Sequence, residues 1–143
     1  MSILEKYISE PRIAYFTMEI GLRDDMPTYS GGLGVLAGDT VKSAADLSLP
    51  FVAVTLISRK GYFKQDIDNK GHQIELPAVW EPSMLMNAAP DKVSITIENR
   101  TVYLQAWIYL VESLRGGDVP VIFLDTDLPE NSPEDRALTD HLY

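Results

Sequence analysis

The sequence predicts an α/β fold built on a strand–helix–strand unit near the start of the chain. Residues 13–17 and 51–57 are continuous apolar runs, and residues 33–47 carry apolar side chains at helical spacing. Continuous apolar runs are typical of strands that are buried on both faces of a parallel sheet. The order strand, helix, strand therefore predicts a right-handed crossover and a parallel strand pair.

Weaker signals flank this unit. Residues 2–9 predict a short amphipathic helix that ends before Pro11, because proline interrupts helices. Residues 18–30 are expected to form a polar loop, and Pro50 separates the main helix from the second strand. The apolar face expected for the main helix consists of Leu33, Leu36, Ala37, Val41, Ala44 and Ala45.

Beyond residue 57 the pattern changes to hairpins. Residues 59–65 and 71–76 predict two strands around an Asp-Asn-Lys-Gly turn, and residues 93–97 and 102–110 predict a second antiparallel pair around a short turn. The stretch between the two hairpins, residues 77–90, contains three prolines and is expected to be irregular.

The last part of the chain predicts one more strand and the start of a helix. Residues 119–124 are a third apolar run, preceded by a Gly-Gly turn. Ser132 is expected to cap a helix whose first residue is Pro133 and whose first turn is acidic. Sheets of this type usually carry more than three buried strands, so the chain is expected to be part of a domain.

Composition excludes several classes of function. The chain has 143 residues, 45% of them hydrophobic, which is enough for one domain with a core. Its formal charge is −9, and Arg59-Lys60 with Lys64 is the nearest approach to a basic patch, so neither nucleic acid nor an anionic membrane is expected as a partner.

Residue usage narrows the chemistry further. Without cysteine the chain has no disulfide, thiolate zinc site or cysteine nucleophile, and its two histidines argue against a histidine-rich metal site. The sequence contains no apolar run of bilayer-spanning length and no signal-peptide core, so a soluble cytoplasmic protein without a bound metal is expected.

The most informative stretch for function is TYSGGLGVLAGD, residues 28–39. Gly31, Gly32 and Gly34 fall where a strand–loop unit passes into the main helix. Backbone N–H groups and the helix dipole favour an anion at such a point, and glycine lets a phosphate or sugar approach without meeting a Cβ. The motif lacks the Gly-Lys-Ser/Thr of a Walker loop and does not have dinucleotide-binding spacing. Part of an active site is expected here.

Five blocks of the chain resemble, in order, the amino-terminal domain of α-glucan phosphorylases, the family of glycogen, starch and maltodextrin phosphorylases. The blocks are AYFTMEIGL (14–22), YSGGLGVLAGD (29–39), AADLSLPFVAV (44–54), GYFKQ (61–65) and LDTDLPENSPEDRALTDHLY (124–143). The VLAGD sequence after the glycines is similar to the short bacterial and archaeal branch. The resemblance covers nearly the whole chain from Ile13.

This resemblance implies a Rossmann-like domain of the GT-B arrangement, in which two such domains face each other across a cleft. Residues 1–143 would be a truncated amino-terminal domain with an inserted antiparallel β-hairpin region, and the carboxyl-terminal cofactor domain would be absent. The family uses phosphate to release α-glucose 1-phosphate from the non-reducing ends of α-1,4-glucans. Its cofactor, pyridoxal 5′-phosphate, is bound to a lysine of the carboxyl-terminal domain. A homodimer is a further expectation.

The resemblance also assigns candidate site residues. Gly31, Gly32 and Leu33 would contact the substrate phosphate and glucosyl unit. Glu19 would lie in the catalytic cleft near the glucosyl and cofactor groups, where it is expected to act by positioning and electrostatics. None of the six lysines lies in a context that resembles the cofactor lysine, so this chain alone is expected to lack phosphorylase activity.

Two alternatives stay open. Glycogen and starch synthases, which share the GT-B arrangement, also have a glycine-rich turn after the first strand, but a lysine precedes their glycines. Here Tyr29 and Ser30 precede them, which favours a phosphorylase. The second alternative is a glucan-binding or interaction module without catalysis; half a cleft should bind maltooligosaccharides poorly.

Some further residues have a structural and a functional interpretation. Asp125 and Asp127 follow the third buried strand, where open α/β sheets place ligands. They suggest a two-carboxylate glycosidase, although a turn or inter-domain role is favoured. His72 and His141 are expected to be ordinary surface or hairpin residues. Several aromatic residues could stack on sugar rings, but a core position is favoured for Trp107.

Overall fold

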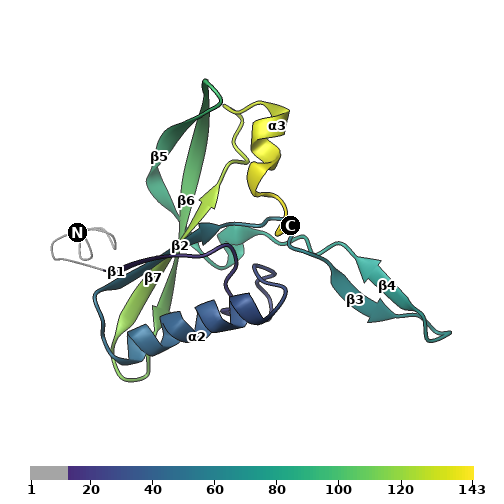
Figure 1. The fold of residues 1–143 in the computed structure, drawn as a ribbon, viewed down its shortest axis with the longest axis horizontal. Helices are drawn as coiled ribbons and strands as arrows, with labels where there is room; N and C mark the ends of the chain where they lie inside the picture. The colour runs from purple at the N-terminus through teal and green to yellow at the C-terminus, as the bar shows by residue number, and fades with distance from the viewer. Residues whose placement is uncertain (1–12) are drawn as a thin grey trace.

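A mixed five-stranded sheet and one long helix form the body of the protein, and a separate two-stranded hairpin projects from it (Figure 1). The structure is a computed structural model that describes residues 13–143. The elements are β1 (Ile13–Phe16), α2 (Gly32–Asp46), β2 (Phe51–Leu56), β3 (Lys64–Ile67), β4 (Gln73–Leu76), the 3-10 turn η1 (Pro82–Met84), β5 (Asn87–Ile97), β6 (Arg100–Glu112), β7 (Asp118–Asp125), α3 (Pro133–Arg136) and the 3-10 turn η2 (Ala137–Thr139).

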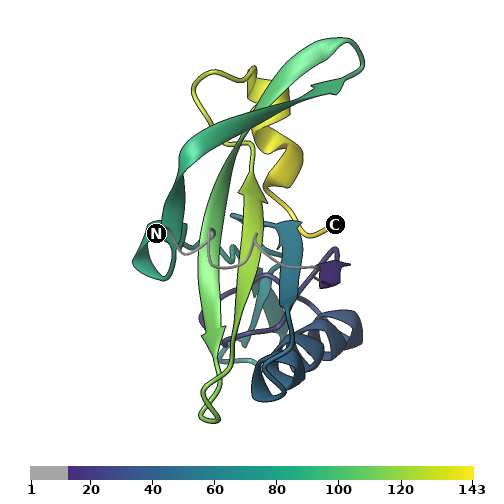
Figure 2. The same ribbon diagram turned by 90° about the vertical axis from the view of Figure 1, so that its left-hand side faces the viewer.

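The main sheet has the strand order β1-β2-β7-β6-β5. β1, β2 and β7 are parallel, which confirms the predicted parallel pair and places the third buried strand beside the second. β6 pairs antiparallel with β7 over residues 105–112, so the β5–β6 hairpin extends the same sheet instead of forming a separate unit. The two strands of this hairpin continue beyond the end of β7 (Figures 1 and 2).

Helix α2 covers one face of the sheet (Figures 1 and 2). The core lies between them, where fully buried residues of the helix meet fully buried residues of β2 and β7: Ala37, Val41, Ala45, Ala53, Val121 and Phe123. The expected apolar face of the helix was wrong near its start, because Leu33 and Leu36 are 48% and 63% exposed. Gly34 and Gly38 are buried in their place, since small residues let the helix approach its neighbours closely.

The prediction that the first strand is buried on both faces was wrong. β1 is the edge strand of the sheet, and Ile13 and Phe16 are 49% and 75% exposed. An apolar run identifies a strand, but its burial depends on what packs over it. Residues 18–30 form a loop, as predicted, but the loop is not polar throughout. Ile20, Met26 and Thr28 are buried within it.

Turn residues explain the two hairpins. Glu98 and Asn99 connect β5 to β6 with φ values of 47° and 65°, as a two-residue type I′ turn requires. The β3–β4 hairpin turns at residues 68–71, as predicted, with Gly71 at φ 85°. Its first strand begins later than expected, at Lys64. All eight residues of β3 and β4 are exposed.

The end of the chain also follows its predicted pattern. The hydroxyl of Ser132 accepts the N–H of Asp135 and caps α3, whose first residue is Pro133, and the helix passes into η2. The helix predicted for residues 2–9 lies outside the described residues. Within residues 13–143, no helix is long and apolar enough to cross a membrane.

Candidate functional site

The glycine turn lies between the loop that leaves β1 and the first turn of α2. Gly31 is the N-cap residue of the helix, and no side chain caps the N–H groups that follow. A Cβ placed on Gly31 or on Gly32 would meet no atom within 4 Å, and both residues are exposed. The turn therefore offers backbone N–H groups and the positive end of a 15-residue helix to a ligand that can come close to the backbone.

The other two glycines of the motif have a different role. A Cβ on Gly34 would lie 2.3 Å from the Cβ of Tyr29, and a Cβ on Gly38 would lie 1.9 Å from the carbonyl oxygen of Gly21. The N–H of Gly21 also donates to the carbonyl of Gly34 at 2.8 Å. Gly34 and Gly38 thus let the helix pack directly on the loop that carries the turn, and they are glycines for packing reasons.

Glu19 is buried beneath the turn and is not a solvated loop carboxylate. Its side chain is 2% exposed. Oε2 accepts the N–H of Ser30 at 2.7 Å, and Oε1 accepts the hydroxyl of Tyr143 at 2.6 Å. Because Ser30 directly precedes Gly31, the carboxylate fixes the backbone at the entrance to the glycine turn. This arrangement suits a positioning role.

Tyr143 connects the end of the described chain to this site. Its hydrogen bond to the Glu19 carboxylate raises the pKa of the phenol, and a smaller effect of burial acts in the same direction. Its ring also packs edge-on against the ring of Tyr62, with the centroids 6.1 Å apart. No pattern in the sequence predicts the hydrogen bond between Tyr143 and Glu19, since the two residues are 124 positions apart.

A hollow of about 320 Å³ lies beside the turn. Ser30 contributes one wall, and the remaining lining is largely aromatic: Pro27, Tyr29, Tyr62, Phe63 and Gln65. Tyr62 is half exposed, so it is not the core residue that an aromatic in a strand usually is. Trp107, in contrast, packs against the core as favoured, and its indole N–H donates to Asp125 at 2.9 Å.

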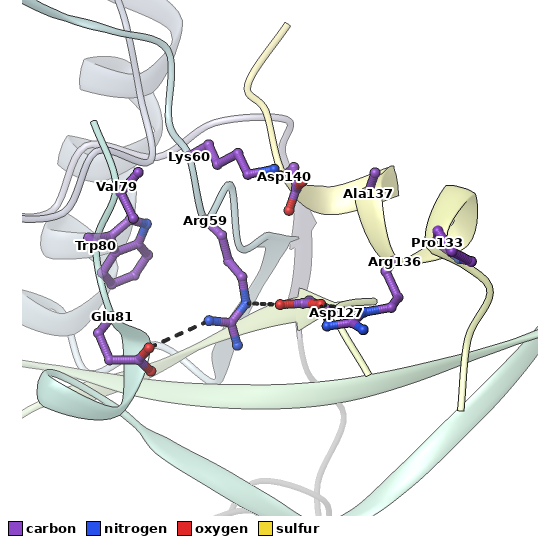
Figure 3. Close-up of a pocket in the computed structure, with 10 residues that line it drawn as sticks. All are labelled: Arg59, Lys60, Val79, Trp80, Glu81, Asp127, Pro133, Arg136, Ala137 and Asp140. Atoms are coloured by element: carbon purple, nitrogen blue, oxygen red, sulfur yellow. Dashed lines mark hydrogen bonds and ion pairs between the residues drawn. The ribbon is translucent and has the colours of Figure 1, made fainter. Parts of the chain in front are cut away.

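A larger cavity, of about 530 Å³, opens where β2 and β7 end (Figure 3). Arg59 projects into it from the segment after β2, and Asp127 from the segment after β7. Lys60 follows Arg59 after β2, and Val79, Trp80 and Glu81 come from the loop before β5. The rest of the lining comes from α3 and the residues after it: Pro133, Arg136, Ala137 and Asp140. The cavity lies at the carboxyl edge of parallel strands, where α/β sheets place ligands.

Buried Asp125 holds the Arg59 side chain in this cavity. The carboxylate is 1% exposed and accepts Nη2 and Nε of Arg59 at 2.6 and 3.0 Å. Its other oxygen accepts the N–H of Asp127 at 2.9 Å. Burial lowers the pKa of the Arg59 guanidinium, but its hydrogen bonds to Asp125 and the negative charges of Asp125, Asp127 and Glu81 together raise it above its usual value. Arg59 and Asp125 thus form an ion pair whose carboxylate is buried.

These contacts weaken the two-carboxylate interpretation. Asp125 holds Arg59 and Trp107, while Asp127 accepts Nε of Arg136 at 2.7 Å. Both carboxylates are thus engaged in ion pairs with arginine. The basic cluster at Arg59-Lys60 is likewise neutralised, because Lys60 pairs with Asp140. His72 lies at the end of the hairpin turn beside Asp68, as expected of a hairpin residue.

The fold and the glycine turn together define a class of protein. Parallel strands whose carboxyl edge carries an open glycine turn at a helix N-terminus are typical of α/β domains that bind phosphate or sugar-phosphate groups. No protein-family profile matches the chain.

Comparison with known sequences is more specific. The chain is 40% identical to the maltodextrin phosphorylase of Thermococcus litoralis over 141 residues, covering 94% of this chain and 16% of that protein. It is 40% identical to the glycogen phosphorylase of Mycobacterium tuberculosis over 139 residues, covering 92% of this chain and 16% of that protein. The glycogen phosphorylase of Aquifex aeolicus is 30% identical over 138 residues, which is 92% of this chain and 19% of that protein.

The chain is homologous to the amino-terminal part of glycogen and maltodextrin phosphorylases. It spans 16–19% of the length of these relatives.

Proposed function

We propose that this chain forms part of an α-1,4-glucan phosphorylase, within a Rossmann-like amino-terminal domain of the GT-B arrangement. In that enzyme, phosphate would release α-glucose 1-phosphate from the non-reducing end of the glucan. The chain would supply the turn of Gly31, Gly32 and Leu33 that contacts the substrate phosphate and glucosyl unit. The homology to proteins named as phosphorylases supports the reaction class.

The open backbone of the glycine turn is the observation that carries the assignment of the site. Gly31 and Gly32 have free space where a Cβ would be, so a ligand can reach the N–H groups at the start of α2. Leu33, on the same first turn, is half exposed and would offer an apolar contact to the sugar ring. Glu19 would act indirectly, by holding the N–H of Ser30 and with it the direction of the turn.

The described lysines do not fit a pyridoxal phosphate site. Lys42, Lys64 and Lys70 are exposed, whereas Lys60 and Lys92 pair with carboxylates at the surface. A lysine that forms a Schiff base is usually desolvated, which lowers the pKa of its amine and makes it nucleophilic. The lysine that binds the cofactor would therefore not be one of residues 13–143, and we assign no step of the reaction to the cofactor.

A chimeric enzyme tests the proposed function. Residues 13–143 would replace the aligned segment of the Thermococcus litoralis maltodextrin phosphorylase, and glucose 1-phosphate formation would be measured. We expect activity in the chimera and a loss of about 100-fold or more in kcat/KM on Gly32→Val, because the valine side chain would displace the ligand from the backbone.

Leu36→Ala is the matched control, since Leu36 is an exposed residue of the same helix beyond its first turn. Circular dichroism and cofactor content would establish that each chimera is folded. Unchanged kinetics in a folded Gly32→Val chimera would overturn the assignment of the glycine turn. A folded chimera without activity, although the parent enzyme is active, would overturn the proposed reaction.

A further inference from the structure

The cavity around Arg59 is not explained by the proposed function. It is separate from the glycine turn, and its lining comes from residues 59–60, 79–81, 127 and 133–140. Figure 3 shows Arg59 in the middle of the cavity, with Glu81 on one side and Asp127 on the other. The arrangement of charges around this guanidinium indicates what kind of ligand the cavity can hold.

Arg59 is held rigidly but keeps unused hydrogen-bonding capacity. Buried Asp125 accepts from Nε and Nη2, which leaves three of the five N–H groups of a guanidinium for other partners. Nη1 lies 3.8 Å from Oε2 of Glu81, and Nε lies 3.8 Å from Oδ2 of Asp127. Neither distance is that of a hydrogen bond. Nη1 therefore keeps free N–H groups opposite Glu81, whereas the single N–H of Nε is already donated to Asp125, so on the other side only the acceptor Oδ2 of Asp127 is open.

Hydroxyl groups fit both positions. A hydroxyl both accepts and donates, so one can accept from Nη1 of Arg59 and donate to Glu81, and a second can donate to Oδ2 of Asp127. Two such positions lie on opposite sides of one planar group, which matches a ring that carries several hydroxyls. A water molecule could occupy either position singly, but a polyhydroxylated ring would occupy both together.

The charge balance favours a neutral ligand. Three cationic side chains line the cavity, and three carboxylates face them: Arg59, Lys60, Arg136, Glu81, Asp127 and Asp140. With Asp125 beneath Arg59, the surroundings carry no surplus of positive charge for an anion. A phosphate ion would be repelled by the carboxylates about as strongly as the cations attract it.

Trp80 supplies an apolar wall. Its indole N–H donates to the carbonyl of Ser58 at 3.0 Å, which fixes the ring, and the ring packs against the core. A sugar ring has an apolar face of C–H groups that can lie on an aromatic surface while its hydroxyls reach polar groups. The cavity volume of about 530 Å³ lies within the range of small-molecule sites.

We propose that this cavity is a second, non-catalytic site that binds a neutral hexose unit, such as a glucosyl residue of an α-glucan. Arg59, Glu81 and Asp127 contact the hydroxyls, and Trp80 contacts the ring. The site does not depend on phosphorylase activity. Its effect is to hold a glucan at a point apart from the glycine turn.

The test uses the 143-residue chain labelled with ¹⁵N and titrated with maltotriose in NMR experiments. We expect saturable shifts of the Trp80 indole N–H and of the Arg59 Nε–H resonance at millimolar concentration. The indole of Trp107, which contacts Asp125 from the core side, serves as an internal reference and should shift less. Inorganic phosphate should not produce these shifts.

Ala137→Trp fills the cavity without removing any ion pair, because Ala137 lines it and carries no polar side chain. We expect it to weaken maltotriose binding by about tenfold or more. Leu138→Trp, an exposed neighbour that does not line the cavity, is the matched control. Glu81→Ala, which removes one acceptor, should also weaken binding by about tenfold.

Absence of the Trp80 shift with maltotriose would overturn the proposal, as would shifts that persist unchanged in folded Ala137→Trp. A response to phosphate in place of sugar would show an anion site and would overturn it too. Gly32→Val should leave the Trp80 shift unchanged, because Gly32 does not line this cavity. The maltotriose test can therefore fail while the proposed function stands, and the chimera test can fail while the sugar site stands.

Discussion

The contrast between Gly32 and Gly34 gives the sharpest test of how the glycine turn is built. Gly34→Ala would place a Cβ 2.3 Å from the Cβ of Tyr29 and 3.0 Å from Oε2 of Glu19. Carbon atoms in contact normally lie about 3.5–4.0 Å apart, so Tyr29 would have to move by about 1 Å. The atom it meets is close to the backbone, which leaves little room for adjustment by rotation of the side chain alone.

The expected magnitude follows from two opposing effects. Overpacking of this kind costs about 1–3 kcal/mol, and the upper part of that range applies because the contact is severe. Alanine is favoured over glycine within a helix by up to about 1 kcal/mol. We therefore expect Gly34→Ala to lower the free energy of unfolding by about 2 kcal/mol. Since it displaces Tyr29 and presses on Glu19, it should also disturb the turn.

Gly32→Ala should behave differently. Its Cβ would meet no atom within 4 Å, and its φ is not positive. The stability should stay the same or rise by about 0.5–1 kcal/mol, because alanine loses less conformational entropy on folding. Urea unfolding of both variants, followed by circular dichroism with the slopes compared, measures the difference. A loss for Gly32→Ala as large as that for Gly34→Ala would refute the division of the motif into ligand-facing and packing glycines.

Three further predictions follow from the contacts of the two sites. The hydrogen bond to Glu19 raises the pKa of Tyr143, so its contribution to stability is complete below the unfolded-state pKa of about 10 and is lost as the pH rises through the higher folded-state value. Tyrosinate absorbance should therefore show a late-titrating group that is missing in Tyr143→Phe. Asp125→Asn should destabilise the chain by about 3 kcal/mol or more in urea unfolding, because it leaves the Arg59 guanidinium without its buried partner; a loss under about 1 kcal/mol would contradict that view. The isolated chain should form no glucose 1-phosphate from maltooligosaccharide, phosphate and added pyridoxal phosphate, and clear product would contradict this.

Local patterns predicted the elements of the sheet body well. The helical spacing of residues 33–47 and the apolar runs at 51–57 and 119–124 correspond closely to α2, β2 and β7. These signals are strong because each segment packs against the others, so its own periodicity reflects the core. Ser132 was equally predictable, since a cap acts on the N–H group only three residues away.

The features that could not be predicted depend on approach between distant segments. The ion pair of Arg59 with Asp125 joins residues 66 positions apart, and no local sequence pattern predicts it. The four glycines of the motif look alike in sequence, yet Gly38 is a packing residue only because Gly21 lies against it. A periodic pattern states which residues are apolar, and the tertiary arrangement decides which of them are covered.

The sheet face opposite α2 shows the consequence of this distinction for the isolated chain. Phe16 of edge strand β1 is 75% exposed and pairs with Val54, which in turn pairs with Ile122 of β7. Leu56, on the same face of β2, is 40% exposed. Contiguous apolar surface next to an open strand edge favours association between copies. We expect the purified chain to self-associate with increasing concentration in sedimentation velocity experiments.

A charged residue on an edge strand opposes such pairing, so Phe16→Lys should shift the chain toward monomer. Leu114→Lys is the matched control, because Leu114 is a fully exposed leucine in the turn between β6 and β7, away from this face. If Leu114→Lys shifted the chain toward monomer as much as Phe16→Lys does, the net charge of the chain would govern association, and the sheet face would not. A chain that stayed monomeric at high concentration would show that the apolar row of Phe16, Val54 and Ile122 does not drive association.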